Sequence, residues 1–150
     1  MRNFTTIDDV LLFALESENQ SIEFYSRLAE YATEESVKKM FLDLMREEVC
    51  HVKKLEYFFS NKNELELSKI DIDLSSDKYL PHVSPAADVA FEECLIIAIQ
   101  KEKAAINLYT DLARESTTQT MIDLFRMLAY EEMKHALLFE NRYQAIKNKC

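Results

Sequence analysis

The sequence predicts an all-α protein whose four helices form two antiparallel hairpins joined by a long crossover. Three observations support this fold class. The 150 residues include no glycine and only two prolines, which leaves little material for tight β-turns or Gly-rich phosphate loops. Apolar residues recur at the helical spacings of three and four. Finally, a shift of 84 positions aligns the two halves of the chain, which indicates a duplicated helical hairpin.

Good capping residues mark the expected start of each helix. We expect the first helix to begin after Thr6 and the second after Thr33. The third is expected after Ser84, with Pro85 in its first turn, and the fourth after Thr117. The chain is therefore predicted to be one domain, 1–150, made of a hairpin over 7–60, a crossover over 61–84 and a hairpin over 85–148.

The connections decide how the helices are joined. The two hairpin turns, near 31–33 and 115–117, are short, so each hairpin should be antiparallel. By contrast, 61–84 breaks the helical period and is long enough to run the length of the helices. One long central crossover is the ferritin-like connectivity of a four-helix bundle. Within it, the alternation of Ile70–Leu74 predicts an extended strip on the surface.

Composition excludes several classes of partner. The formal charge of -9 argues against nucleic acid and against an anionic membrane surface, because both require a basic protein face. No apolar run approaches the roughly 20 residues that span a bilayer. Asp8 and Asp9 interrupt any secretory signal, so we expect a cytoplasmic protein. Cys50, Cys94 and Cys150 form no Cys-x-x-Cys pair and are expected to be free thiols.

A repeated Glu-x-x-His motif carries the chemistry. Its two copies lie 84 residues apart, and each follows an isolated glutamate on the preceding helix. A Glu and a His three residues apart share one face of a helix. Two such pairs and two further glutamates form the ligand set of a carboxylate-bridged two-metal centre in a four-helix bundle. The predicted metal ligands, which are also the predicted catalytic residues, are Glu18, Glu48, His51, Glu102, Glu132 and His135.

The spacing also predicts that these side chains meet inside the protein. Glu18 lies about 21 Å before the first hairpin turn and Glu48 about 22 Å after it, at the rise of a helix. Both glutamates fall within apolar stripes and should point inward, and Glu102 and Glu132 repeat the pattern. Four clustered buried carboxylates require neutralisation, which two divalent cations would supply while the histidines bind as neutral donors. The alternative is a metal-free descendant of such a bundle.

Four further polar residues near the motif could support the metal ligands, although another role is favoured for each. Tyr25 and Tyr109 lie two turns beyond Glu18 and Glu102, where a phenol could bond a ligand carboxylate, although core packing is favoured. Glu47 and Glu131 could support the ligands, although solvated charges are favoured.

Three other residues near the motif or in the crossover are not expected to be ligands. Cys50 should point away from the ligand face, and Met133 is interpreted as a packing residue. His82 is expected to lie in an exposed loop.

The pattern resembles the rubrerythrin-like branch of the ferritin-like di-iron carboxylate proteins. The resemblance lies in Glu18-x6-Tyr25, Glu47-Glu48-x2-His51 and their second copies, and it covers nearly the whole chain outside the crossover. It implies a cofactor of two iron ions (Fe2+/Fe3+), with manganese or a mixed pair as alternatives. It also implies a peroxidase-type oxidoreductase that reduces hydrogen peroxide or dioxygen in oxidative-stress defence. The expected partners are an external electron donor such as a rubredoxin and, in a homodimer, a second copy of the chain.

Two departures from the family pattern leave other functions open. Rubrerythrins carry an extra glutamate three residues past the helix-three ligand, where this chain has Ala105. They also carry a rubredoxin module after the fourth helix, so here we expect a separate protein as electron donor. One alternative is an iron-binding ferroxidase for iron sequestration or delivery, although a 24-subunit store is disfavoured. The other is a di-iron hydroxylase.

Overall fold

The computed structural model describes residues 4–67, 69–80 and 90–148. This part of the chain divides into two compact units, one from Phe4 to Ile70 and one from Asp71 onward. Each unit is built around a pair of long helices, which confirms the all-α prediction. The helices are α1 (Ile7–Tyr31), α2 (Glu35–Asn61), α3 (Phe91–Glu115) and α4 (Gln119–Lys147).

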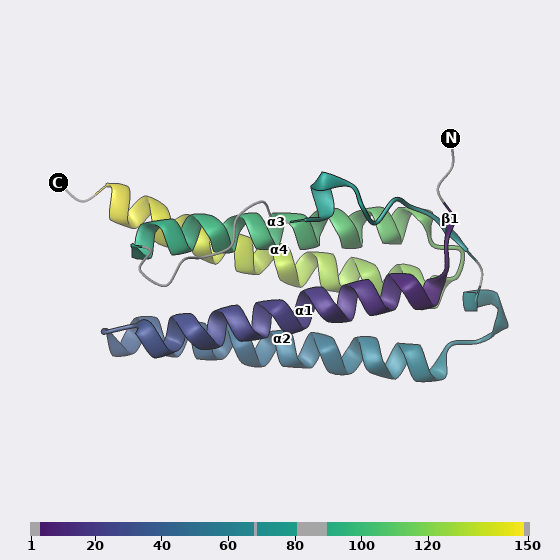
Figure 1. Cartoon of the computed structure of the whole chain (residues 1–150), viewed down its shortest axis with the longest axis horizontal. Coiled ribbons are helices and arrows are strands. Elements are labelled where there is room, and N and C mark those ends of the chain that lie inside the picture. The colour runs from purple at the N-terminus through teal and green to yellow at the C-terminus, as the bar shows by residue number, and fades with distance from the viewer. Residues whose placement is uncertain (1–3, 68, 81–89, 149–150) are drawn as a thin grey trace. The chain divides into compact units, whose positions relative to one another are not determined.

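In the first unit, α1 and α2 lie side by side as an antiparallel hairpin (Figure 1). Their facing stripes follow the predicted spacing, and Tyr25 stacks on Phe41 with ring centroids 6.3 Å apart. Burying large apolar side chains of this kind stabilises a hairpin by about 1.5–3 kcal/mol for each side chain. The buried apolar residues include Val10, Leu11, Ala14, Leu28, Leu44, Leu55 and Phe58.

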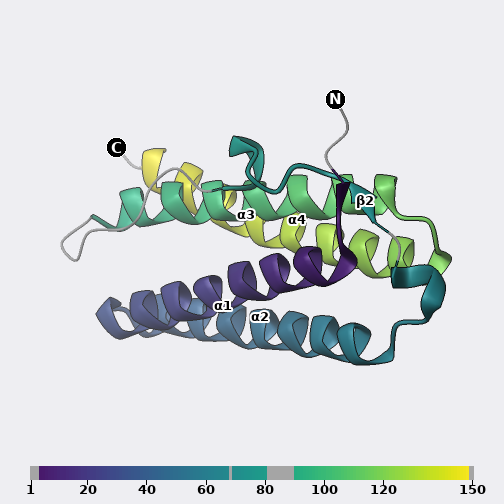
Figure 2. The same cartoon turned by 45° about the vertical axis from the view of Figure 1, so that its right-hand side comes forward.

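The second unit repeats this arrangement with α3 and α4 (Figure 2). Tyr109 stacks on Phe125 at 6.2 Å, so the aromatic pair of the first hairpin recurs at the position that the duplication predicts. The buried apolar residues here include Leu95, Ala98, Leu108, Leu112, Met121, Leu128 and Phe139.

The helix starts confirm some expected caps and correct others. The Thr6 hydroxyl accepts a hydrogen bond from the Asp9 N–H at 3.1 Å, as predicted for α1. The predictions for α2 and α4 were one residue early. Helix α2 follows Glu34 rather than Thr33, without a side-chain cap. In α4 the cap is the second of two adjacent threonines, Thr118, which accepts from the Met121 N–H.

The third helix also differs from expectation. The predicted start at Ser84 and Pro85 lies outside the described residues, and so does His82. The described helix begins at Phe91, after Ala90 in an extended conformation, so a helix running unbroken from Pro85 is wrong.

The helix ends reflect the absence of glycine. Many helices end with a left-handed residue, usually glycine, whose missing Cβ removes the steric cost. Here the residues after α1, α2 and α3 are Ala32, Lys62 and Ser116, and all three are extended. Among the described residues none has a positive φ. The chain therefore leaves α1, α2 and α3 directly into extended backbone, which suits short turns.

The described crossover is held by local polar contacts and two isoleucines. Asn63 and Glu66 cap each other's backbone N–H groups at the 3-10 turn η1 (Glu64–Leu67). The extended segment predicted at 70–74 contains a short strand, β2 (Ile70–Asp71), which pairs with β1 (Phe4–Thr5). Ile70 and Ile72 are buried, so the alternation marks an anchored segment.

A buried carboxylate in α3 fixes the next part of the crossover. Asp111 accepts a hydrogen bond from the Tyr79 hydroxyl at 2.6 Å, and its ion-pair partners are Lys78 at 2.7 Å and Arg114 at 3.0 Å. Tyr79 and Lys78 belong to the 3-10 turn η2 (Asp77–Tyr79). Burial opposes ionisation of Asp111, but these three neighbours outweigh it and hold its pKa below the ordinary value. The turn is thereby fastened to α3.

None of the helices that the structure describes has the combination of length and apolarity that a membrane span requires.

Candidate metal centre

Each hairpin buries two glutamates and a histidine. In the first, Glu18 of α1 is only 3% exposed, Glu48 of α2 is 1% exposed and His51 is fully buried. They occupy the inward stripes because Ala14 and Tyr25 flank Glu18 at helical spacing and are themselves buried. Burial of acidic groups among apolar neighbours has a large free-energy cost, so these positions indicate a function other than packing.

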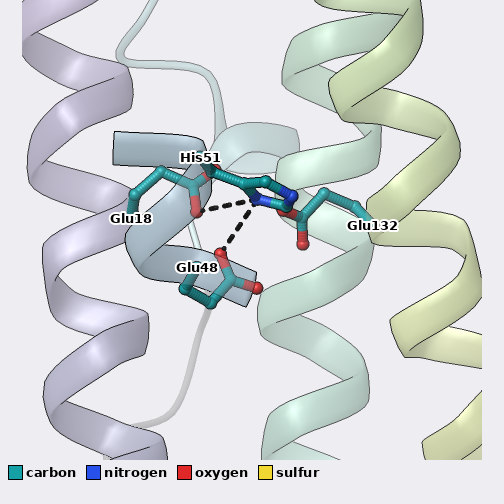
Figure 3. Close-up of side chains that lie close together, drawn as sticks. All are labelled: Glu18, Glu48, His51 and Glu132. Atoms are coloured by element: carbon teal, nitrogen blue, oxygen red, sulfur yellow. Dashed lines mark ion pairs between the residues drawn. The ribbon is translucent and has the colours of Figure 1, made fainter. Parts of the chain in front are cut away.

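The α1–α2 half-site consists of Glu18, Glu48 and His51 (Figure 3). The figure shows Glu18 reaching from α1 toward Glu48 and His51, which come from α2. His51 Nδ1 lies 3.4 Å from Glu18 Oε2 and 3.3 Å from Glu48 Oε2. All three residues offer a ligand atom within 4.8 Å of the others. Three donor groups from two helices therefore converge on one point.

The α3–α4 half-site consists of Glu102, Glu132 and His135. His135 Nδ1 lies 3.7 Å from Glu102 Oε1 and 3.6 Å from Glu132 Oε2. All three side chains are buried. The second hairpin therefore reproduces the first half-site in composition, burial and geometry, as the duplicated motif predicts.

Burial and like charge perturb the ionisation of Glu18. Loss of water, followed by the charge of Glu48 and a hydrogen bond with it, raises the pKa of Glu18 to about 8, although His51 acts in the opposite direction. In the metal-free chain, Glu18 is therefore protonated near neutral pH. A cation bound at this point would replace that proton.

The donor set fits transition-metal ions. Two ligand atoms that each lie about 2.0–2.2 Å from one ion are roughly 3.0–3.5 Å apart at ordinary coordination angles. The distances in the α1–α2 half-site fall in that range, and those in the α3–α4 half-site are slightly longer. Mixed carboxylate and imidazole donors suit iron or manganese, and carboxylates can bridge two ions. The residues present can therefore hold such metals.

The other candidate residues differ in burial and in their contacts. Tyr25 and Tyr109 are buried and stack on phenylalanines, as the packing interpretation expects; a bond from either phenol to a ligand carboxylate stays a prediction. Glu47 is exposed, which favours the solvated charge, whereas Glu131 is partly buried. Cys50 is exposed and free, as expected for a non-ligand.

The interpretation of Met133 as a packing residue is wrong. Its side chain is 46% exposed, because one step along α4 from the buried Glu132 turns it by about 100° toward solvent.

Sequence reasoning also missed the buried Asp111. Its counterpart in the first repeat is the exposed Arg27, so the departure from the repeat was the available signal. Its partner Tyr79 lies 32 residues away in the aperiodic crossover, where spacing gives no guidance.

Comparison with known proteins agrees with the helical fold and with the buried sets of glutamate and histidine. The sequence model of the Rubrerythrin family matches residues 9–90 and 93–149. No curated protein matches the chain. A crystal structure from Thermotoga maritima, of a protein described as a candidate ferritin-like diiron-carboxylate protein, is similar with a TM-score of 0.80 and 22% identity. The similarity covers 96% of this chain and 98% of that one, which confirms the predicted ferritin-like fold. With a family match over almost its whole length, this chain belongs to the rubrerythrin family.

Proposed function

We propose that the two half-sites together bind two iron ions and that the protein is a non-haem di-iron oxidoreductase that reduces hydrogen peroxide. The observation that carries the proposal is the repeated buried set of two glutamates and one histidine, one set in each hairpin. Membership of the rubrerythrin family supports a di-iron centre for such a set. Dioxygen is the alternative oxidant.

The charges of the six side chains match two divalent ions. Glu18, Glu48, Glu102 and Glu132 supply four negative charges when ionised, and two divalent ions supply four positive ones. His51 and His135 contribute neutral nitrogen donors, so each half-site with one divalent ion is close to neutral. If only some of the four carboxylates were neutralised, an uncompensated charge would stay buried, which costs several kcal/mol.

Bound iron would supply the redox chemistry by cycling between Fe2+ and Fe3+. The chain's own residues would hold the ions, and their burial excludes bulk water. Hydrogen peroxide accepts two electrons and two protons and leaves as two water molecules. The electrons come from an external donor.

Rapid mixing tests the proposal. The anaerobic protein loaded with two ferrous ions per chain is mixed with hydrogen peroxide and, separately, with dioxygen, while ferric absorption is followed. We expect oxidation much faster than that of free ferrous ion, with peroxide the faster oxidant. Oxidation no faster than that of free ferrous ion would exclude the enzymatic proposal. Retention of many irons per chain in a large assembly would instead favour iron storage.

The cellular location belongs to the same proposal. We also propose that the protein is cytoplasmic. Fractionation of cells that express the full chain tests it, and recovery outside the cytoplasm would contradict it.

A further inference from the structure

Helix α4 carries a stripe of exposed apolar side chains opposite its metal-ligand face. Tyr130, Met133 and Leu137 are 62%, 46% and 56% exposed, and their spacing of three and four places them on one side of the helix. Glu132 and His135 lie between them in sequence and are buried. The same two turns of helix therefore present metal ligands on one side and an apolar surface on the other.

A groove runs beside this stripe within the second unit. It has a volume of about 440 Å³ and is lined from α3 by Thr110, Ala113 and Arg114, and from α4 by Arg126, Ala129, Tyr130 and Met133. We call these seven residues the α3–α4 groove. Tyrosine, methionine and arginine are the residues enriched in the cores of protein interfaces.

The charge of the groove is opposite to that of the chain. The protein carries 27 acidic and 18 basic residues, yet the groove lining includes two arginines and no carboxylate. Lys134 lies over the Tyr130 ring, 5.2 Å from its centroid, and adds a third cation at the edge. Arg114 forms ion pairs with Asp111 and Glu115. By contrast, Arg126 and Lys134 form no ion pair with any residue that the structure describes. The groove is therefore a local basic patch.

The duplicated hairpin provides an internal comparison. The positions in the first repeat that match Arg114, Arg126 and Tyr130 are Glu30, Leu42 and Arg46. Arg46 is bound by Asp43 at 3.0 Å. The combination of two arginines with an exposed tyrosine thus belongs to the second hairpin only, so it is not a by-product of the common hairpin design.

We propose that the α3–α4 groove is the docking site of an acidic protein that donates electrons to the metal centre. The proposal rests on the proposed function. An acidic partner would be repelled by most of this chain and attracted by Arg126 and Lys134, which selects one orientation. Tyr130 and Met133 would form the apolar core of the interface. The partner would then lie across α4 from Glu132 and His135, a separation of about one helix diameter, roughly 10 Å.

The electron balance is simple. A one-electron donor delivers one electron in each encounter and is itself oxidised; in the rubredoxin used as the probe below, Fe2+ becomes Fe3+. Two encounters supply the two electrons that, with two protons, convert one hydrogen peroxide into two water molecules.

The test uses the full, iron-loaded and oxidised protein, with a reduced acidic rubredoxin as the probe. The second-order rate constant of electron transfer is measured by stopped-flow absorption at low ionic strength. We expect Arg126→Glu to lower this constant by about tenfold or more. The control is Arg46→Glu, which makes the same change of charge on an exposed face of α2 and should alter the constant by less than about twofold. In the unsubstituted protein the constant should fall as salt is added.

Three further readouts separate the possible outcomes. Reduction by dithionite should be equal in all three proteins, which shows that the metal centre is intact. If Arg126→Glu and Arg46→Glu changed the rate constant with rubredoxin equally, the docking site would be wrong. It would also be wrong if this chain formed a dimer that dissociates on Arg126→Glu. If rubredoxin binds in a manner that depends on Arg126, as measured by calorimetry, but no electron passes, the docking site stands and the proposed function fails.

Discussion

At the scale of single residues, two neighbouring glutamates differ in burial. Glu47 and Glu48 have the same chemistry and adjacent positions, yet Glu47 is exposed and Glu48 is 1% exposed and lies beside His51. The apolar period of α2 determines which of the two points inward. This could be predicted from the sequence, because Leu44 and Leu55 set the stripe and Glu48 falls in it.

Removing one ligand should therefore remove metal. We predict that Glu48→Gln or His135→Ala loses at least one of two bound irons per chain, because each substitution deletes a donor atom. Metal analysis of the purified variants measures this. Glu47→Gln is the matched control and should keep its full metal content. Full occupancy in Glu48→Gln would contradict the assignment.

The raised pKa of Glu18 predicts how stability depends on pH in the metal-free protein. The pKa is about 8 in the folded chain and 4.5 for an ordinary glutamate, so the folded state binds more protons between these values. The free energy of unfolding should then fall as pH rises from about 5 to 8, by up to ~1.4 kcal/mol per pH unit for one proton.

Urea denaturation of the metal-free chain across this pH range measures the slope. Because Glu48 is one cause of the shift, Glu48→Gln should lower the upper end of the pH range over which the free energy of unfolding falls. A free energy of unfolding that rises over the same range would contradict the buried position of Glu18.

At the scale of elements, the crossover is fastened to α3 by one polar cluster. Tyr79→Phe removes the 2.6 Å hydrogen bond to Asp111 and leaves the ring in place, so we predict a loss of about 1–2 kcal/mol in unfolding free energy. Denaturant titration measures it. Tyr57→Phe, at a position 71% exposed, is the control and should have almost no effect. Equal losses in the two variants would show that the bond does not hold the crossover.

Some features of the helices and the crossover could be predicted from the sequence, and others could not. Helix existence and the inward stripes could be predicted, because the apolar spacing of both hairpins is regular and duplicated. The starts of α2 and α4 could not be placed to the residue. Helix α2 has no side-chain cap, and either of the adjacent Thr117 and Thr118 could cap α4. The contact between Asp111 and Tyr79 could not be predicted, because it joins a periodic helix to an aperiodic segment; only the departure from the repeat at Asp111 was visible in the sequence.

At the scale of the whole molecule, metal and stability should be linked. Bound cations would neutralise the buried carboxylates of both half-sites, so removing metal with a chelator should destabilise the protein near neutral pH. An ion present at 100 times its dissociation constant stabilises the folded state by about 2.7 kcal/mol, which corresponds to about 5–10 °C in melting temperature for a chain of this length. Calorimetry before and after chelation measures the shift. An unchanged melting temperature would mean that the carboxylates bind no metal in the folded protein.

The most direct test of the central claim is the metal stoichiometry. In an anaerobic titration of the metal-free chain with ferrous ion, followed by calorimetry, the account predicts saturation at two ions per chain in the unsubstituted protein, and fewer when either Glu48 or His135 is replaced. Saturation at a single ion, or no tight binding, would contradict a centre built from two half-sites.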